Sequence, residues 1–361
     1  IASSRARGAG EVVELGERDL SFSIVAGTIL GSLIPIAGLL WFFAQGGPIA
    51  ANPVGVIFAT LLFVLFIGAI IAAVTGYMAG LIGASNSPVS GVGILAIIAA
   101  SLMLLLFFGR NHSEADTAAL VAYALFTTAI VFSVATISND NLQDLKTGQL
   151  VGATPWKQQL ALVIGVGFGS LIIPPVLDLL NQAFGFAGAA GAGANALPAP
   201  QAALISALAK GVLGGDLRWD LIGYGALIGA AIIAADEILG RMGKLRLPPL
   251  GVGMGIYLPM SLTLLIPIGA VIGHFWEKRA ERSARPEFYS RMGVLLATGF
   301  IVGESIFGVL FAGVVAGSGS DAPLALVGES FERTAIIVGL SLFVALIAYS
   351  YRRTRRATES V

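Results

Sequence analysis

Residues Val54–Met78 read VGVIFATLLFVLFIGAIIAAVTGYM, a run without a single Asp, Glu, Lys or Arg. An α-helix rises about 1.5 Å per residue, so a run of this length crosses a hydrocarbon core of about 30 Å. The stretch therefore predicts a transmembrane helix.

Seven further apolar stretches have the same character, so that eight full membrane spans are expected. The other seven lie at Phe22–Phe43, Val89–Phe108, Ala118–Ile137, Gln159–Leu180, Trp219–Leu239, Met292–Val315 and Ala335–Tyr351. Charged residues make up only 12% of the chain, against roughly 25% in soluble domains. The runs are continuous rather than alternating, which argues against a transmembrane β-barrel. The sequence predicts an all-α polytopic helical bundle that forms a single membrane domain, 1–361.

Two other apolar segments are shorter or interrupted. Gln201–Leu213 is half a span long, and Leu247–Trp276 contains four prolines and the run Gly251-Val252-Gly253-Met254-Gly255. Broken backbone at membrane depth needs protein or water to satisfy its N–H and C=O groups, and such segments often build a transporter's substrate site. We expect a re-entrant hairpin or two half-helices in 247–276. A single Pro-kinked helix is the alternative.

The basic residues predict an orientation. If the N-terminus is cytoplasmic and 247–276 leaves on its side of entry, most of the 21 Lys and Arg residues face the cytoplasm, as the positive-inside rule expects. The polar lead-in 1–19 and the basic tail 352–361 are then both cytoplasmic. Asp236 and Glu237 lie close to Arg241 in the sequence, which favours an interfacial ion pair.

A polar block, Ser138–Gln159, separates two of the spans. If the block is helical from Ser138, four of its side chains share one face at i, i+3, i+4 and i+7 spacing: Asp140, Gln143, Asp144 and Thr147. Two carboxylates one turn apart repel each other, which raises one pKa and can create a proton site. Lys146 is close enough to offset that charge. The alternative is a solvated cytoplasmic loop with an ordinary charged helix.

Glu304 lies well inside the predicted span Met292–Val315. A carboxylate within the membrane is costly, usually faces the protein interior and is a functional candidate by default. Gly299 and Gly303 form a Gly-xxx-Gly pair that allows another helix to approach closely. A protonated glutamate with a structural hydrogen bond is the alternative reading.

Enzyme chemistry finds little support in the sequence. The chain has no cysteine and two histidines, and it lacks the Gly-x-Ser-x-Gly, His-Glu-x-x-His and Walker motifs. We therefore expect no catalytic residues, no metal site, no cofactor and no nucleic-acid partner.

Several segments, in order, resemble the oligopeptide transporter (OPT) superfamily, in particular its prokaryotic and yellow-stripe-like branch. They are Gly80–Gly91, the Gln-Asp-Leu-Lys-Thr-Gly stretch Gln143–Gly148, Leu197–Gln201, Gly255–Pro259 and the pair Gly303-Glu304. The resemblance runs from about residue 10 to residue 315. Several independent segments in one order are far more specific than any single motif.

The resemblance implies a secondary transporter, typically proton-coupled, for small peptides, glutathione-like compounds or metal chelates. Chains of this family are about twice as long, so the sequence looks like the C-terminal half, with the N-terminal half of the same transporter as a partner. It also implies roles for particular residues. Glu304 is the proton-coupling candidate, and the substrate path or cavity would involve Asn86, Asp140, Asn141, Gln143, Asp144, Lys146, Gly251, Gly253, Gly255, Tyr257 and Pro259.

The leading functional hypothesis is a proton-coupled transporter in the cell membrane that works by alternating access. Its partners would be the lipid bilayer, protons, and a small peptide or chelate. A passive channel is the second hypothesis, and a membrane-embedded enzyme such as an intramembrane protease is the third. The sequence leaves the oligomeric state open, including a homo-oligomer.

Overall fold

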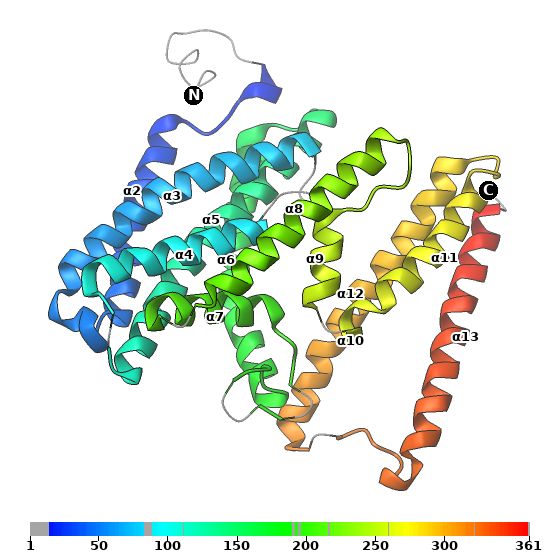
Figure 1. Cartoon of the computed structure of the whole chain (residues 1–361). Coiled ribbons are helices and arrows are strands. Elements are labelled where there is room, and N and C mark those ends of the chain that lie inside the picture. The colour runs from blue at the N-terminus through cyan, green and yellow to red at the C-terminus, as the bar shows by residue number, and fades with distance from the viewer. Residues whose placement is uncertain are drawn as a thin grey trace. The chain divides into compact units, whose positions relative to one another are not determined.

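The computed structural model describes residues 14–82, 89–110, 112–189, 192–193, 196–215, 217–258, 260–320 and 322–359 of the 361-residue chain. Within these ranges the chain is helical, with one isolated β-bridge between Phe186 and Leu197 and no β-strand (Figure 1). It divides into two compact units. Unit 1 lies within Ile1–Ile172 and Ala199–Ile222, and unit 2 within Ile173–Pro198 and Gly223–Val361.

Unit 1 is built around one long helix, α5. Its elements are η1 (Leu15–Glu17), α2 (Phe22–Phe43), η2 (Gly47–Ala51), α3 (Pro53–Ile82), α4 (Val89–Phe108), α5 (Glu114–Leu150), the first part of α6 (Pro155–Ala183) and α7 (Pro200–Gly214). Helix α5 packs against α2, α3, α4, α7 and η2. The apolar core of unit 1 therefore collects around α5, with Leu40, Ile97, Leu104 and Leu120 fully buried in it.

Local sequence signals set the ends of these helices. The Ser113 hydroxyl accepts a hydrogen bond from the backbone N–H of Asp116 at 3.1 Å and so caps the first turn of α5. Helix α7 has Pro200 in its first turn and ends at Gly215, which has a φ of +84°. Gly152, with a φ of +73°, lies in the turn between α5 and α6, where an L side chain would be strained.

Unit 2 contains the end of α6 and most of α8 (Trp219–Arg241), followed by α9 (Pro249–Tyr257), α10 (Met260–Thr263), α11 (Leu265–Ala280), α12 (Pro286–Ser318), η4 (Glu329–Phe331) and α13 (Glu332–Glu359). Helix α12 packs against both α11 and α13. The Trp276 ring of α11 lies against Gly293 of α12, at a position where a Cβ atom would have no room. A glycine is therefore required there for α11 and α12 to approach this closely.

Eight helices among the described residues are long and apolar enough to cross a membrane, which confirms the predicted all-α polytopic architecture. The bounds of α2 and α4 agree with the predicted spans residue for residue. The half-length segment Gln201–Leu213 is also helical, as part of α7. The expectation of a single membrane domain stays a prediction.

Helix α5 differs most from expectation, because it continues thirteen residues beyond the predicted end at Ile137 and includes the first half of the polar block. Its 37 residues correspond to about 55 Å, far more than a hydrocarbon core of about 30 Å. Hydropathy marks where the apolar part ends, whereas the backbone hydrogen bonds continue until Gly152 permits a turn. Ser138–Leu150 is therefore helical, as both readings of the polar block allow, and the choice between a proton site and an ordinary charged helix stays open.

The interrupted segment 247–276 is broken as predicted. It forms α9, α10 and the larger part of α11, with interruptions around Leu258 and Leu264. Residues 259 and 86, two of the predicted substrate-path positions, lie outside the described residues. Re-entry of this segment on its side of entry stays a prediction.

Candidate functional site

Helix α5 carries a line of buried side chains spaced one turn apart, and several of them are polar. Tyr123, Thr127, Val131, Ala135 and Asn139 succeed one another at four-residue intervals and are all buried. Four-residue spacing places them along one face of the helix. The name α5 polar stripe is used for Tyr123, Thr127 and Asn139 of this line, together with the buried Thr128 of α5 and the buried Ser101 of α4.

Part of the stripe holds α3 against α5. The Thr60 hydroxyl lies 3.0 Å from the Tyr123 hydroxyl, and the Thr75 hydroxyl donates to the Ala135 carbonyl at 3.2 Å. Near the end of the apolar region, Ser138 donates to the Ala72 carbonyl at 2.7 Å. Hydrogen bonds between helices contribute about 0.6 kcal/mol each on average in membrane proteins. These hydrogen bonds fix the position of α3 relative to α5 at several points along the two helices.

Four other buried polar atoms of the stripe have no hydrogen-bond partner among the described residues. They are the hydroxyl oxygens of Ser101, Thr127 and Thr128 and the side-chain oxygen of Asn139. Buried polar groups in native proteins are almost always satisfied, so each of these atoms calls for water, an ion or a ligand. None of the four groups titrates near neutral pH, so they can orient a polar solute but cannot exchange a proton with it.

The predicted face of the polar block continues from the end of the stripe. Asp140, Gln143, Asp144 and Thr147 are all exposed, while Asn141 is half-buried. Asn139 donates a long hydrogen bond of 3.5 Å to Asp140, which joins the stripe to the block.

Lys146 does not neutralise this face. Its ammonium group donates to the Gln149 side chain at 3.1 Å, and the described residues show no ion pair between it and Asp140 or Asp144. The helix thus presents two exposed carboxylates that one turn separates.

The chain before α2 is tied to the end of the polar block. The backbone N–H of Leu20 donates to the Gln159 side chain at 3.2 Å, and the Trp156 N–H donates to the Arg18 carbonyl at 3.0 Å. The Gln158 side chain fills the space beside Gly148, where a Cβ atom would overlap it. These contacts hold the turn between α5 and α6 in one place.

The loop before α9 is anchored by a two-pronged ion pair. The Arg246 guanidinium donates to the two carboxylate oxygens of Asp236 at 2.9 and 2.5 Å, and the Leu247 N–H donates to the same carboxylate at 2.8 Å. The Asp236 carboxylate raises the pKa of Arg246 above its ordinary value. Glu237 forms the expected pair with Arg241, at 3.1 Å. The sequence therefore predicted one pair correctly and missed Arg246 as the partner of Asp236.

Helix α9 exposes the glycines that the sequence singled out. Gly251, Gly253 and Gly255 are exposed along it, and the side chain of Tyr257 lies outside the described residues. Ligand contacts at these positions stay a prediction.

Glu304 is exposed in the middle of α12, and no described residue forms an ion pair with it. A Cβ atom added to Gly299 or Gly303 would meet nothing within 4 Å. The Gly-xxx-Gly surface is therefore open within the described chain. We expected Glu304 to face the protein interior, but no described residue of unit 2 covers it.

Sequence reasoning missed most of the α5 polar stripe. The available signal was the spacing of Tyr123 and Thr127, one turn apart inside an apolar helix. That signal is weak, because Ser and Thr in helices commonly bond the carbonyl four residues earlier, as Ser133 does with Ala129. Among the described residues no group of three or more His, Cys, Asp or Glu side chains is arranged to hold a metal ion.

The long apolar helices define a multi-pass helical membrane protein. The model of the family described as "OPT oligopeptide transporter protein" matches residues 17–315. The chain belongs to this family.

Relatives with curated names agree with this assignment. A Haemophilus influenzae protein named "Putative oligopeptide transporter" is 41% identical over 329 residues, which cover 83% of this chain and 52% of that protein. The rice (Oryza sativa subsp. japonica) "Probable metal-nicotianamine transporter YSL14" is 30% identical over 195 residues, 52% of this chain and 25% of that protein. A Saccharomyces cerevisiae protein named "Putative oligopeptide transporter YGL114W" is 24% identical over 80% of this chain and 37% of its own length.

The chain thus spans about half the length, or less, of the curated relatives it matches. No solved structure matches it.

Proposed function

We propose that this chain is part of a secondary active transporter that moves small peptides, peptide-like compounds or metal chelates across the membrane. The unpartnered oxygens of the α5 polar stripe carry the proposal. A membrane protein gains nothing by burying four unsatisfied polar atoms, because each costs roughly 1–3 kcal/mol when it has no partner. A polar substrate, or the water that accompanies it, would supply those partners. Family membership and the names of the relatives agree with a peptide or chelate as that substrate.

In this proposal the substrate path continues from the stripe to the exposed polar block. The side chains that would line it there are Asp140, Asn141, Gln143, Asp144 and Lys146. Asn139 sits at the junction, because it is buried and also contacts Asp140. In unit 1, Asn86 of the segment after α3 would contribute as well. In unit 2, the broken segment would contribute substrate contacts of its own through Gly251, Gly253, Gly255, Tyr257 and Pro259. Anchoring of the preceding loop by Asp236 and Arg246 would hold α9 in position.

Coupling to protons would depend on Glu304, with alternating access as the transport mechanism. A mid-span carboxylate can be carried through an apolar environment once protonated, since neutralisation removes most of the cost of burial. Moving one charge through 100 mV supplies about 2.3 kcal/mol, enough to drive accumulation. We place both ends of the chain in the cytoplasm, and we assign the N-terminal half of the same transporter as the partner that covers α12.

The central test removes hydroxyl groups from the stripe without changing its shape. The complete protein that carries this chain is reconstituted in liposomes with an imposed proton gradient, and uptake of a radiolabelled tripeptide and of a metal–nicotianamine chelate is measured. The double substitution Thr127→Val, Thr128→Val is expected to lower uptake at least about tenfold, which corresponds to about 1.4 kcal/mol.

The matched control is Ser133→Ala with Thr136→Val on the same helix. These two hydroxyls bond carbonyl groups of their own helix, at 2.8 Å and 3.1 Å, so their removal should leave uptake unchanged. A stability measurement separates function from structure. If the two hydroxyls lacked partners in the working transporter as well, the Thr→Val substitutions would stabilise the protein and preserve uptake. That result would contradict the proposal.

A further inference from the structure

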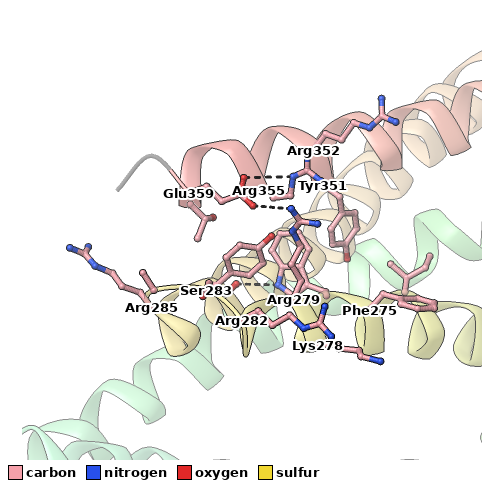
Figure 2. Close-up of a pocket in the computed structure, with 15 residues that line it drawn as sticks. Phe275, Lys278, Arg279, Arg282, Ser283, Arg285, Tyr351, Arg352, Arg355 and Glu359 are labelled. Carbon is pink, nitrogen blue, oxygen red and sulfur yellow. Dashed lines mark hydrogen bonds and ion pairs between the residues drawn. The ribbon is translucent and has the colours of Figure 1, made fainter.

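A pocket of about 1020 Å³ lies in unit 2, between the end of α11 and the end of α13. The turn after α11 and the first turn of α12 complete its walls. Six of the fifteen residues that line it are basic: Lys278, Arg279, Arg282, Arg285, Arg352 and Arg355. Figure 2 shows that they come from the end of α11, from the turn that follows it and from α13.

This positive charge is poorly compensated. Glu359 is the acidic residue that lines the pocket, and it lies 3.3 Å from Arg279 and 3.9 Å from Arg355. The remaining basic side chains of the lining form no ion pair with a described residue. Six basic side chains against one carboxylate leave an excess of five positive charges in the lining. Like charges gathered this closely repel one another, so the pocket is suited to an anion.

The base of the pocket is aromatic and closely packed. The ring centroids of Trp276 and Tyr289 lie 4.8 Å apart, and those of Trp276 and Tyr351 lie 5.2 Å apart. The Trp276 indole N–H donates to the Tyr289 carbonyl at 3.1 Å. The Tyr289 hydroxyl is buried and makes no well-aligned hydrogen bond with a described residue. The Arg279 guanidinium lies close enough to this hydroxyl to interact with it electrostatically. The base thus holds the aromatic rings in fixed positions beneath the basic side chains.

The pocket lies where an apolar helix becomes a charged one. Helix α11 is apolar from Leu265 to Gly273 and carries Lys278 and Arg279 in its last turn. Ile272 and Phe275 line the apolar side of the pocket and are largely exposed. Trp and Tyr side chains beside basic residues are typical of the level of the lipid headgroups.

We infer that this pocket binds the phosphate headgroup of an anionic phospholipid. Guanidinium groups match phosphate oxygens with paired, charge-assisted hydrogen bonds, and basic pockets between transmembrane helices are known sites for acidic headgroups. The exposed Ile272 and Phe275 would contact the acyl chains. These apolar contacts favour a lipid over free phosphate, because free phosphate has no apolar part that could contact Ile272 and Phe275.

The test measures lipid retention by the purified protein in neutral detergent. Native mass spectrometry compares phosphatidylglycerol with phosphatidylcholine of the same acyl chains, because the two differ in net charge. We expect phosphatidylglycerol to bind at least about tenfold more tightly than phosphatidylcholine, and the double substitution Arg282→Gln, Arg352→Gln to reduce its binding about tenfold. Neither arginine forms an ion pair with a described residue, so the fold should survive.

The matched control is Arg353→Gln with Arg356→Gln, which removes the same charge from α13 outside the pocket lining. It should leave phosphatidylglycerol binding intact. Equal losses in the two double variants, or no preference for phosphatidylglycerol in the unmodified protein, would overturn the inference. Inorganic phosphate in large excess should not displace the lipid, and full displacement would assign the pocket to free phosphate instead. Thermal unfolding of each variant in the same detergent identifies any loss of binding that comes from misfolding.

Discussion

Helices α5 and α12 are the centres of their units and have similar lengths, 37 and 33 residues, yet their surroundings differ completely. Ten residues of α5 are buried, and they extend along much of the helix. Four residues of α12 are buried, two towards each end: Tyr289, Gly293, Ala312 and Val315. The middle of α12, where Glu304 lies, is covered by nothing in the described chain.

Hydropathy predicts that both helices cross a membrane, but it does not predict what surrounds them. Both helices are apolar enough to cross a membrane. A bilayer provides no hydrophobic drive between helices, so association depends on close packing of small residues and on polar contacts. In unit 1, Gly76 and Gly93 lie directly against α5, whereas Gly299 and Gly303 of α12 have open space beside them. The same residue type therefore marks a formed interface at Gly76 and Gly93, as it does at Gly293 of α12, and a vacant surface at Gly299 and Gly303.

The largest expected effect comes from crowding the formed interface. In Gly93→Val, the new Cβ would lie 2.5 Å from the Phe132 ring of α5, and a rigid ring cannot move aside cheaply. Overpacking of this kind costs about 1–3 kcal/mol, visible as a lower thermal midpoint of the purified protein in detergent.

The controls for this substitution are Gly91→Val on the same helix and Gly299→Val on α12. Both carry the same change in helix propensity, because valine replaces glycine in each, but neither new side chain meets an atom within 4 Å of its Cβ. When the 361-residue chain is purified without the proposed partner of α12, the two controls should unfold at equal temperatures, both above that of Gly93→Val. If Gly299→Val were as damaging as Gly93→Val, the α12 surface would be covered and the contrast between the units would fail.

Glu304→Gln should produce the next largest effect, on transport rather than on stability. Glutamine keeps the size of the side chain but cannot carry a proton, so uptake driven by a proton gradient should fall at least about tenfold, or about 1.4 kcal/mol. Protein level and gradient-independent substrate exchange should stay close to those of the unmodified protein.

Asp178→Asn is the matched control, because the Asp178 carboxylate lies near the end of α6 and accepts a hydrogen bond from Gln182 at 2.8 Å. It should leave gradient-driven uptake unchanged. Accumulation by Glu304→Gln that equals the unmodified protein at every pH would remove Glu304 from proton coupling.

The smallest expected effect is the loss of one interhelical hydrogen bond. Tyr123→Phe removes the hydroxyl beside Thr60, which keeps its bond to the Val56 carbonyl at 2.8 Å. We expect a destabilisation of about 0.6 kcal/mol in detergent unfolding, because no buried group is left without a partner. Tyr224→Phe on the exposed surface of α8 should change nothing. A much larger loss in Tyr123→Phe would show that the α3–α5 contact is more cooperative than its separate hydrogen bonds.

The sequence predicted the helical face of the polar block, but it did not predict the buried α5 polar stripe. The spacing of Asp140 and Asp144 predicted a shared helical face, and both residues lie on α5. The hydroxyls of Thr127 and Thr128 resemble those of any apolar helix, and only their burial without partners distinguishes them. The ion pair between Asp236 and Arg246 joins residues ten apart across a turn, a separation that helix periodicity does not address.

The sequence alone determined which segments cross the membrane, because the cost of placing charge in hydrocarbon is large and depends mainly on local composition. The same local signals determined the break in 247–276 and the family, which the order of short motifs identifies. Tertiary structure alone decided which faces of those helices are buried. Burial depends on complementary shapes of segments that are distant in the sequence, such as Gly93 and Phe132. The identity of a residue does not indicate which distant residue will pack against it.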